Sequence, residues 1–71
     1  MSGSKTIRQV MIDTDTSVKA IAEALRQQPQ SISNRLSRDT WRLDTFIAWL
    51  DVMGADVVVK VRSTGHVFPL E

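Results

Sequence analysis

The amino-acid sequence predicts a mainly α-helical domain of four short helices, followed by a C-terminal β-strand or short β-ribbon. Apolar residues recur every three or four positions through most of the chain before Gly54, which is helical spacing. After Gly54 the pattern changes to consecutive β-branched residues, which favour a strand. We therefore divide the chain into a flexible N-terminus (1–4), a helical domain (5–55) and a C-terminal β segment (56–71).

The first predicted helix runs from about Lys5 to Asp13, with Ser4 as its N-terminal cap. Its inward-facing stripe is expected to contain Ile7, Val10 and Met11. The segment DTDTS at 13–17 then predicts a turn and a cap, because short oxygen-bearing side chains accept hydrogen bonds from the first N–H groups of a helix. A calcium-binding loop is the weaker interpretation, since it requires a later glycine and glutamate that are missing here.

Two short helices with a proline between them are predicted in the stretch 17–38. The apolar stripe of the first contains Val18, Ile21, Ala22 and Leu25. Pro29 suits the first position of the second helix, where its missing N–H costs nothing, and Ile32 and Leu36 face the same way. Two short helices joined by a tight connection are the layout of a DNA-binding helix-turn-helix.

The polar face of the second of these helices predicts DNA contact. A solvated helix face is usually rich in Glu and Lys, whereas this face carries amides and hydroxyls. Gln30 and Asn34 are the main candidates for base contact, because Gln and Asn pair with adenine through two hydrogen bonds, and Arg35 and Arg38 lie to one side to reach phosphates. The predicted DNA-contacting residues are Gln28, Gln30, Ser31, Ser33, Asn34, Arg35 and Arg38. Each residue alone also fits an ordinary polar surface, so the prediction depends on the joint pattern.

The second helix of this pair is the expected recognition helix, and the chain after it predicts a break and then the strongest helix. Asp39 and Thr40 are expected to end one helix, and Trp41 to pack as a wedge before the next, in preference to stacking on a base. Gly54 is expected to end the last helix, at 43–53. The apolar stripe of that helix is predicted to contain Leu43, Phe46, Ile47, Leu50 and Met53.

The end of the chain carries more apolar surface than so small a domain can cover. Trp49 and Val52 lie at and beyond the edge of the last helical stripe. A strand is expected at 56–62, then a turn at 63–66 and a second short strand at 67–68 before a proline. Because a two-stranded ribbon is not stable alone, it either pairs with the same segment of another chain or packs on the last helix and leaves an edge for pairing. The expected dimer-interface residues are Trp49, Val52, Val57, Val58, Val59, Val61 and Phe68.

Charge is divided between two parts of the chain, although the formal net charge is only +1. From Lys19 to Arg42, five basic and two acidic side chains give +3, whereas three aspartates give −3 from Leu43 to Val59. Basic charge on the DNA-facing part and acidic charge behind it favour electrostatic steering. The chain has no cysteine, no apolar run of membrane-spanning length and no signal-peptide core, so we expect a cytoplasmic protein without disulfides.

The run from Ile21 to Gly54 resembles the Cro-like and phage-repressor-like (XRE-type) helix-turn-helix family of phages and bacteria, particularly its short members with a C-terminal β-strand. The matching positions are Ile21, Ala22, Leu25, Pro29, Gln30, Ile32, Ser33, Asn34, Leu36, Arg38, Asp39, Leu43 and Gly54. This chain departs from the family in having Arg26 in place of the usual turn glycine and Gln28 in place of the usual Ser or Thr cap. The resemblance implies DNA binding, transcription regulation in a phage or mobile element, and dimerisation through the C-terminal strand.

The expected function is therefore sequence-specific binding of double-stranded DNA by a homodimeric transcriptional regulator, a repressor, on an inverted-repeat operator. Two recognition helices would lie about 34 Å apart, one DNA turn. The alternative is a protein-interaction module of the same fold, an antirepressor or antitoxin, that binds a protein partner through the last helix and the strand edge. The sequence predicts no enzyme, cofactor or metal site, because its one histidine, His66, falls in a turn without nearby candidate ligands.

Overall fold

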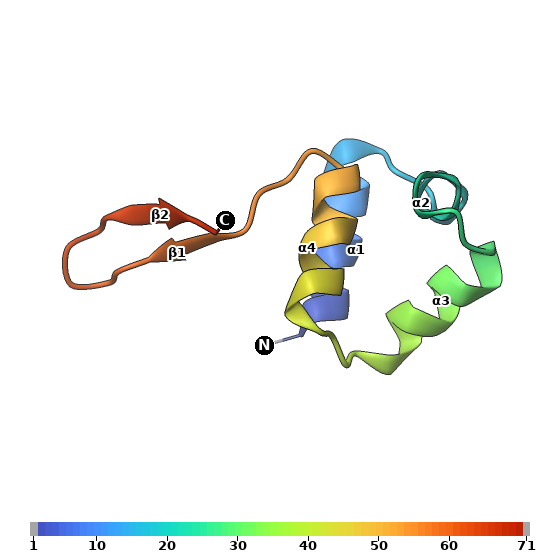
Figure 1. Ribbon diagram of the computed structural model, residues 1–71, viewed down its shortest axis with the longest axis horizontal. Helices are drawn as coiled ribbons and strands as arrows, with labels where there is room; N and C mark the ends of the chain where they lie inside the picture. Colours follow the sequence, from blue (N-terminus) through green and yellow to red (C-terminus); the bar gives the residue numbers. More distant parts are fainter. Residues whose placement is uncertain (1, 71) are drawn as a thin grey trace.

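The computed structural model describes residues 2–70 and contains four helices followed by a β-hairpin (Figure 1). This confirms the predicted fold class. The elements in chain order are α1 (Gly3–Thr14), α2 (Val18–Leu25), α3 (Pro29–Arg38), α4 (Leu43–Val52), β1 (Val58–Lys60) and β2 (Val67–Pro69). None of the helices among the described residues has the length and apolar character needed to cross a membrane.

The helices form one body, and the hairpin extends from it. In Figure 1, α1 and α4 lie side by side, with α2 and α3 on one side of them and the hairpin on the other. The molecule is accordingly elongated, with extents of 42 × 21 × 21 Å. The recognition helix predicted from the sequence, α3, therefore lies at the end of the molecule opposite the hairpin.

All four helices contribute to a single hydrophobic core. The fully buried side chains of Ile7, Ile21 and Ile32 come from α1, α2 and α3, and α4 adds Trp49 and Leu50. Burial of each such side chain contributes about 1.5–3 kcal/mol to folding. No residue of the hairpin from Val58 to Leu70 belongs to this buried set.

The first helix begins earlier than the sequence predicted. Its N-terminal cap is Ser2, whose hydroxyl oxygen accepts a hydrogen bond of 3.1 Å from the backbone N–H of Lys5. The prediction of Ser4 as the cap is therefore wrong: Gly3 and Ser4 are helical, and Ser4 is buried. The remaining residue of the expected flexible N-terminus, Met1, lies outside the described residues.

The second helix has the ends that its sequence predicts. The hydroxyl of Ser17 accepts a hydrogen bond of 3.1 Å from the N–H of Ala20, which confirms a cap in the 13–17 segment. Arg26, which stands where the resembled family has glycine, ends the helix in the left-handed conformation with φ 55°. A non-glycine residue in this conformation costs about 1 kcal/mol. The fold tolerates this cost because the following N–H, of Gln27, donates to the Ala22 carbonyl.

The buried face of α4 differs from the predicted one. Leu43 was expected in the stripe but is 59% exposed, whereas Trp49 was expected at its edge and is 2% exposed. The helix turns toward Trp49 because the Trp41 ring packs against the Trp49 ring edge to face, with centroids 4.8 Å apart. Trp49, Leu50 and Met53 are buried, and Phe46, Ile47 and Val52 are half-buried. Trp49 is thus a core residue of one chain, and its prediction as an exposed dimer-interface residue is wrong.

The C-terminal segment forms an antiparallel hairpin. Val58 pairs with Pro69, Val59 with Phe68 and Lys60 with Val67. Pro69 is therefore the last residue of β2, whereas the sequence predicted that the strand ends before it. Gly65 closes the turn with φ 75° and donates its N–H to the Val61 carbonyl (2.7 Å). The strands do not pack on α4, so the second of the two sequence-based alternatives is not the arrangement of the chain.

Candidate nucleic-acid interface

The orientation of α3 is set by two buried side chains. Ile32 and Leu36 are 0% and 5% exposed and fix the helix against the core. Pro29 occupies the start of the helix, where no N–H is required. Because Ile32 and Leu36 are buried four residues apart, the opposite face must point to solvent. That face carries the exposed residues Gln30, Ser31, Ser33, Asn34 and Ser37.

The two residues predicted to contact bases are joined by a hydrogen bond. The side-chain amide Nε2 of Gln30 donates to Oδ1 of Asn34 at 3.0 Å, across one helical turn. This leaves the Gln30 carbonyl oxygen as an acceptor and the Asn34 amide nitrogen as a donor. An adjacent acceptor and donor complement the N6 amino group and N7 of adenine in the major groove. The hydrogen bond also restrains two flexible side chains before a ligand arrives, which reduces the entropy lost on binding.

A polar hollow of about 210 Å³ lies beside this pair, lined by Ser31, Asn34, Arg35 and Arg38. Two of its four lining residues carry guanidinium groups, which bind phosphate oxygens through charge-assisted hydrogen bonds. Of the seven predicted DNA-contacting residues, the structure brings these four together around one hollow. Gln30 joins them through its bond to Asn34.

The side chains of the two arginines that line the hollow differ in how firmly neighbouring residues hold them. The guanidinium carbon of Arg35 lies 6.0 Å from the centre of the Trp41 ring, and its Nη1 donates to the Thr40 carbonyl at 3.2 Å. Arg35 is therefore held in place, with other N–H donors still available. Arg38, the last residue of α3, is exposed. It takes no part in the one ion pair found among residues 2–70, which joins Arg42 and Asp44.

The C-terminal end of α3 is tied to the start of α1. Asp39 follows the helix in the left-handed conformation, and its Oδ1 accepts a hydrogen bond of 2.9 Å from the backbone N–H of Ser4. The Ser4 hydroxyl in turn accepts a hydrogen bond of 3.0 Å from the Trp41 indole N–H. The Ser4 N–H, with a smaller contribution from the Ser2 hydroxyl, lowers the pKa of Asp39 because both stabilise the carboxylate.

Sequence reasoning missed this tie between Ser4, Asp39 and Trp41. The residues are 35 and 37 positions apart, and no local pattern relates them. The one signal in the sequence is an aspartate directly after a helix, a residue type that tolerates the left-handed conformation. The tie fixes the backbone next to Arg38 and so positions one end of the candidate interface.

Trp41 is a packing residue, as the sequence predicted. Its ring contacts Phe46 and Trp49 edge to face, with centroids 5.8 and 4.8 Å away. Gly3 lies so close that a Cβ atom added there would be 2.7 Å from Trp41 Cδ1. These contacts and the hydrogen bond to Ser4 hold the indole within the domain, where it is not free to stack on a base.

Gln28 and Ser33 complete the set of predicted DNA-contacting residues. Gln28 is the N-cap of α3, and only its backbone carbonyl takes part in capping, since no hydrogen bond joins its side chain to the helix. Both side chains are exposed. The Ser33 carbonyl accepts a hydrogen bond of 3.1 Å from the Ser37 hydroxyl, which reduces the donors available at Ser37.

The predicted dimer-interface residues separate into three groups. The exposed group lies on and next to the hairpin strands and consists of Val58, Val59, Val61 and Phe68. Val52 and Val57 are half-buried near the junction of α4 and the hairpin, and Trp49 belongs to the core. The exposed apolar surface of the C-terminal part is therefore concentrated on the hairpin.

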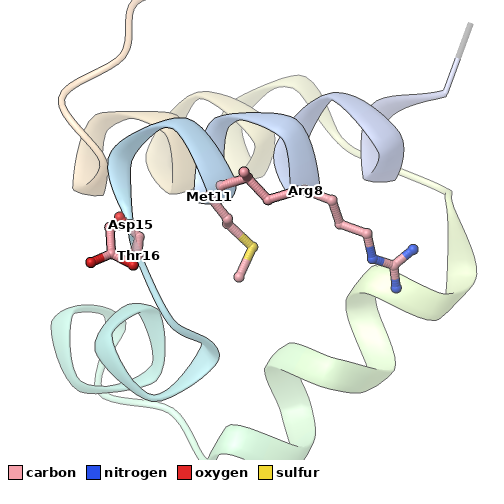
Figure 2. Close-up of a pocket in the computed structure, with 5 residues that line it drawn as sticks. Arg8, Met11, Asp15 and Thr16 are labelled. Atoms are coloured by element: carbon pink, nitrogen blue, oxygen red, sulfur yellow. The ribbon is translucent and has the colours of Figure 1, made fainter.

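A larger hollow lies away from α3, along α1. A cavity of about 470 Å³ lies along α1 and its C-terminal turn, and Figure 2 shows Arg8 and Asp15 at its two ends with Met11 between them. It contains no histidine or serine. Among residues 2–70 no group of three His, Asp or Glu side chains is placed to hold a metal ion. The chemically richest surface is thus the exposed face of α3.

Comparisons of this chain with protein-family models, with curated proteins and with solved structures found no match.

Proposed function

We propose that this protein is a cytoplasmic, sequence-specific transcriptional regulator that binds double-stranded DNA as a homodimer and represses transcription from an inverted-repeat operator. The observation that carries the proposal is the exposed face of α3. On this face, the hydrogen-bonded Gln30 and Asn34 lie beside the guanidinium groups of Arg35 and Arg38.

In the proposed complex, α3 enters the major groove with its exposed face toward the bases. An α-helix fits this groove, and the groove edge of each base pair presents a distinct set of donors and acceptors. Gln30 and Asn34 read one A·T pair, and Gln28, Ser31 and Ser33 make the neighbouring polar contacts. The anchoring of α3 through Ile32 and Leu36 supports this role, because a reading helix must present its side chains in a fixed orientation.

The arginines supply the part of the affinity that does not depend on sequence. The exposed Arg38 side chain contacts one phosphate. Arg35, whose guanidinium group lies over the Trp41 ring, contacts another from a restrained position. Each phosphate contact releases counterions, so binding must weaken as salt rises. Asp44 and Asp51 on α4, and Asp56 after it, are repelled by DNA and favour approach by the α3 side.

Selection of binding sites from a random duplex library at about 150 mM salt tests the proposal, with the winning site measured again over a range of salt. We expect enrichment of an inverted repeat and an affinity that falls steeply with salt. Folded protein that enriches no sequence, under conditions where a known regulator succeeds, would contradict the proposal.

The second candidate function is a protein-interaction module of the same fold, an antirepressor or antitoxin. The observation that favours it is the exposed hairpin, where Val59 and Phe68 are 50% and 53% exposed. The burial of Trp49 reduces the surface available for such a partner to Val52 and the hairpin. A library without enrichment, together with a partner captured by the hairpin, would favour this function over DNA binding.

A further inference from the structure

One side of α1 is apolar at its centre and charged at both ends. Ile12, at the centre, is 81% exposed, the largest exposed fraction among the large apolar side chains of the described residues. Arg8 lies one turn before it, and Asp15 lies one turn after it, directly beyond the last helical residue; both are exposed. Residues three or four positions apart lie on the same face of a helix. The exposed stripe therefore runs from a positive charge through an isoleucine to a negative charge.

The α1 hollow of about 470 Å³ lies beside Ile12, on the same side of the helix. The half-buried Met11 lies in it between the two charged residues (Figure 2). Thr16 also lines it, and the Thr16 hydroxyl shares a hydrogen bond of 2.7 Å with the Thr14 hydroxyl, so this polar group already has a partner. The surface thus presents a protruding isoleucine next to a recess that can receive an apolar side chain.

No other element of the described chain covers this side of α1. The helix packs on α3 and α4, and in Figure 2 none of the neighbouring helices crosses the side that carries these side chains. Neither Arg8 nor Asp15 takes part in the ion pair between Arg42 and Asp44. An exposed apolar centre with charged residues at its rim is the usual composition of a protein–protein contact surface.

The stripe is complementary to itself when two helices run antiparallel. We propose that two copies of this chain associate through this side of α1, with the two-fold axis between Met11 and Ile12. Arg8 of each copy then faces Asp15 of the other, because the two residues lie at equal distances on either side of the axis. Ile12 of each copy enters the hollow beside Met11 of the other. Each of these contacts is made twice, as in any two-fold interface.

Other arrangements of the two helices lose the charge pairing. In a parallel pair in register, Arg8 faces Arg8 of the second copy and Asp15 faces Asp15, and like charges repel. A shift by one helical turn moves each Arg8 about 5.4 Å away from the opposite Asp15. Exposed ion pairs contribute little binding energy, so their main effect is to select the antiparallel register. The affinity comes from the burial of Ile12 and of the apolar walls of the hollow.

The contact is small, so the complex it forms is weak. The stripe from Arg8 to Asp15 spans about 10.5 Å of helix, less than the interface of a permanent dimer. We expect a dissociation constant between about 10 μM and 1 mM. None of its residues belongs to the candidate nucleic-acid interface or to the expected dimer-interface set. The inference therefore goes beyond the proposed function and does not depend on it, and in the proposed homodimer this contact would add a second association step.

Two charge-reversal variants test the pairing. Arg8→Glu places like charges together at both ends of the contact, and Asp15→Arg does the same with the opposite sign. Sedimentation equilibrium of either variant alone should show a dissociation constant raised about tenfold. An equimolar mixture should restore association, because each end then joins an acidic side chain of one variant to a basic side chain of the other. Arg26 has nearly the same backbone conformation as Asp15, with φ 55° against 53°, so the chain tolerates arginine there.

Ile12→Gln tests the apolar part of the contact. Because Ile12 is 81% exposed, this variant should keep the melting temperature of the wild type while its dissociation constant rises about tenfold or more. Glu23→Arg is the matched control for Asp15→Arg: it makes the same change of charge at an exposed position of α2, which does not pack on α1, and it should leave association unchanged. Far-UV circular dichroism and thermal unfolding check that all four variants keep the fold.

Two results would overturn the proposal: a mixture of the two charge-reversed variants that associates no more strongly than either variant alone, or an Ile12→Gln variant whose association up to about 1 mM equals that of the wild type. These measurements contain no DNA. Restored association in the mixture, together with a wild type that selects no DNA site, would support the α1 contact and contradict the proposed function.

Discussion

The helical domain (residues 2–55) and the hairpin (residues 57–70) use their apolar side chains in opposite ways. In the helical domain Ile7, Ile21 and Ile32 are completely buried within one chain. In the hairpin the large apolar side chains from Val58 to Leu70 remain between about one-third and one-half exposed. The difference indicates that the helices build a core within one chain, although Ile12 and Leu43 stay exposed, whereas residues 58–70 of the hairpin bury none of their large apolar side chains in that core.

The same two regions also differ in how they reverse direction. The hairpin turn places glycine at its left-handed position, Gly65. The three reversals between helices instead place Asp15, Arg26 and Asp39 in that conformation. Glycine adopts it without steric cost, so the helical domain carries strain that its core must offset.

The largest expected effect comes from removing core volume. Ile32→Ala should lower the free energy of unfolding by about 2–5 kcal/mol, because it leaves a cavity between α3 and the rest of the core. Val59→Ala in the hairpin removes a side chain that is half exposed. It should change the unfolding of the helices by less than about 0.5 kcal/mol. Urea denaturation followed by helical circular dichroism measures both. Equal losses would show that the hairpin is part of the same cooperative unit and remove the contrast between the regions.

DNA recognition should belong to the helical domain alone. Asn34→Ala is expected to cost about 1–3 kcal/mol of binding free energy on the selected site and little on random DNA, whereas Arg38→Ala weakens binding to both. Fluorescence anisotropy with the two duplexes measures these differences, and sedimentation checks that both variants keep the wild-type association state. Equal losses on both duplexes from Asn34→Ala would remove this residue from base reading.

The exposed face of α3 and the hairpin were both predictable from local sequence patterns. The exposure of Gln30, Ser33 and Asn34 follows from the spacing of Ile32 and Leu36, so the candidate interface was predictable from one helix. The hairpin followed from its β-branched run and its Gly65 turn. The spacing of Ile32 and Leu36 and the β-branched run each involve residues close together in the chain, so each can be read without knowing the tertiary structure.

Contacts between distant elements were not predictable in this way. The last helix carries apolar residues on several sides, so periodicity alone does not decide whether Leu43 or Trp49 faces the core. Packing against Trp41 decides it. The hydrogen bond between Ser4 and Asp39 likewise depends on where α1 meets the end of α3.

A smaller effect tests the strain at the turns. Arg26→Gly should raise the free energy of unfolding by up to about 1 kcal/mol, because glycine adopts the left-handed conformation at no steric cost. Thermal unfolding measures it. Asp15→Gly is the comparison at a second positive φ, 53° against 55°. A destabilised Arg26→Gly variant would show that the Arg26 side chain makes a contribution larger than the strain it imposes.

The smallest expected effect is the pH dependence of the Asp39 tie. Hydrogen bonds to its carboxylate lower the pKa of Asp39 in the folded state, so the folded state holds the proton less tightly than the unfolded state does. The stabilisation is therefore fully present above the ordinary Asp pKa of about 3.9 and is lost as the pH falls through the lower folded value. Asp39→Asn keeps an oxygen acceptor for the Ser4 N–H without the charge, and Asp39→Ala removes the acceptor. Between neutral pH and pH ~3, the melting temperature of the wild type should fall further than that of Asp39→Asn, while Asp39→Ala should be the least stable of the three at neutral pH. Parallel pH profiles for wild type and Asp39→Asn would mean that the carboxylate charge contributes nothing at this junction, and that Asp39 is required only for its hydrogen bond and its left-handed backbone.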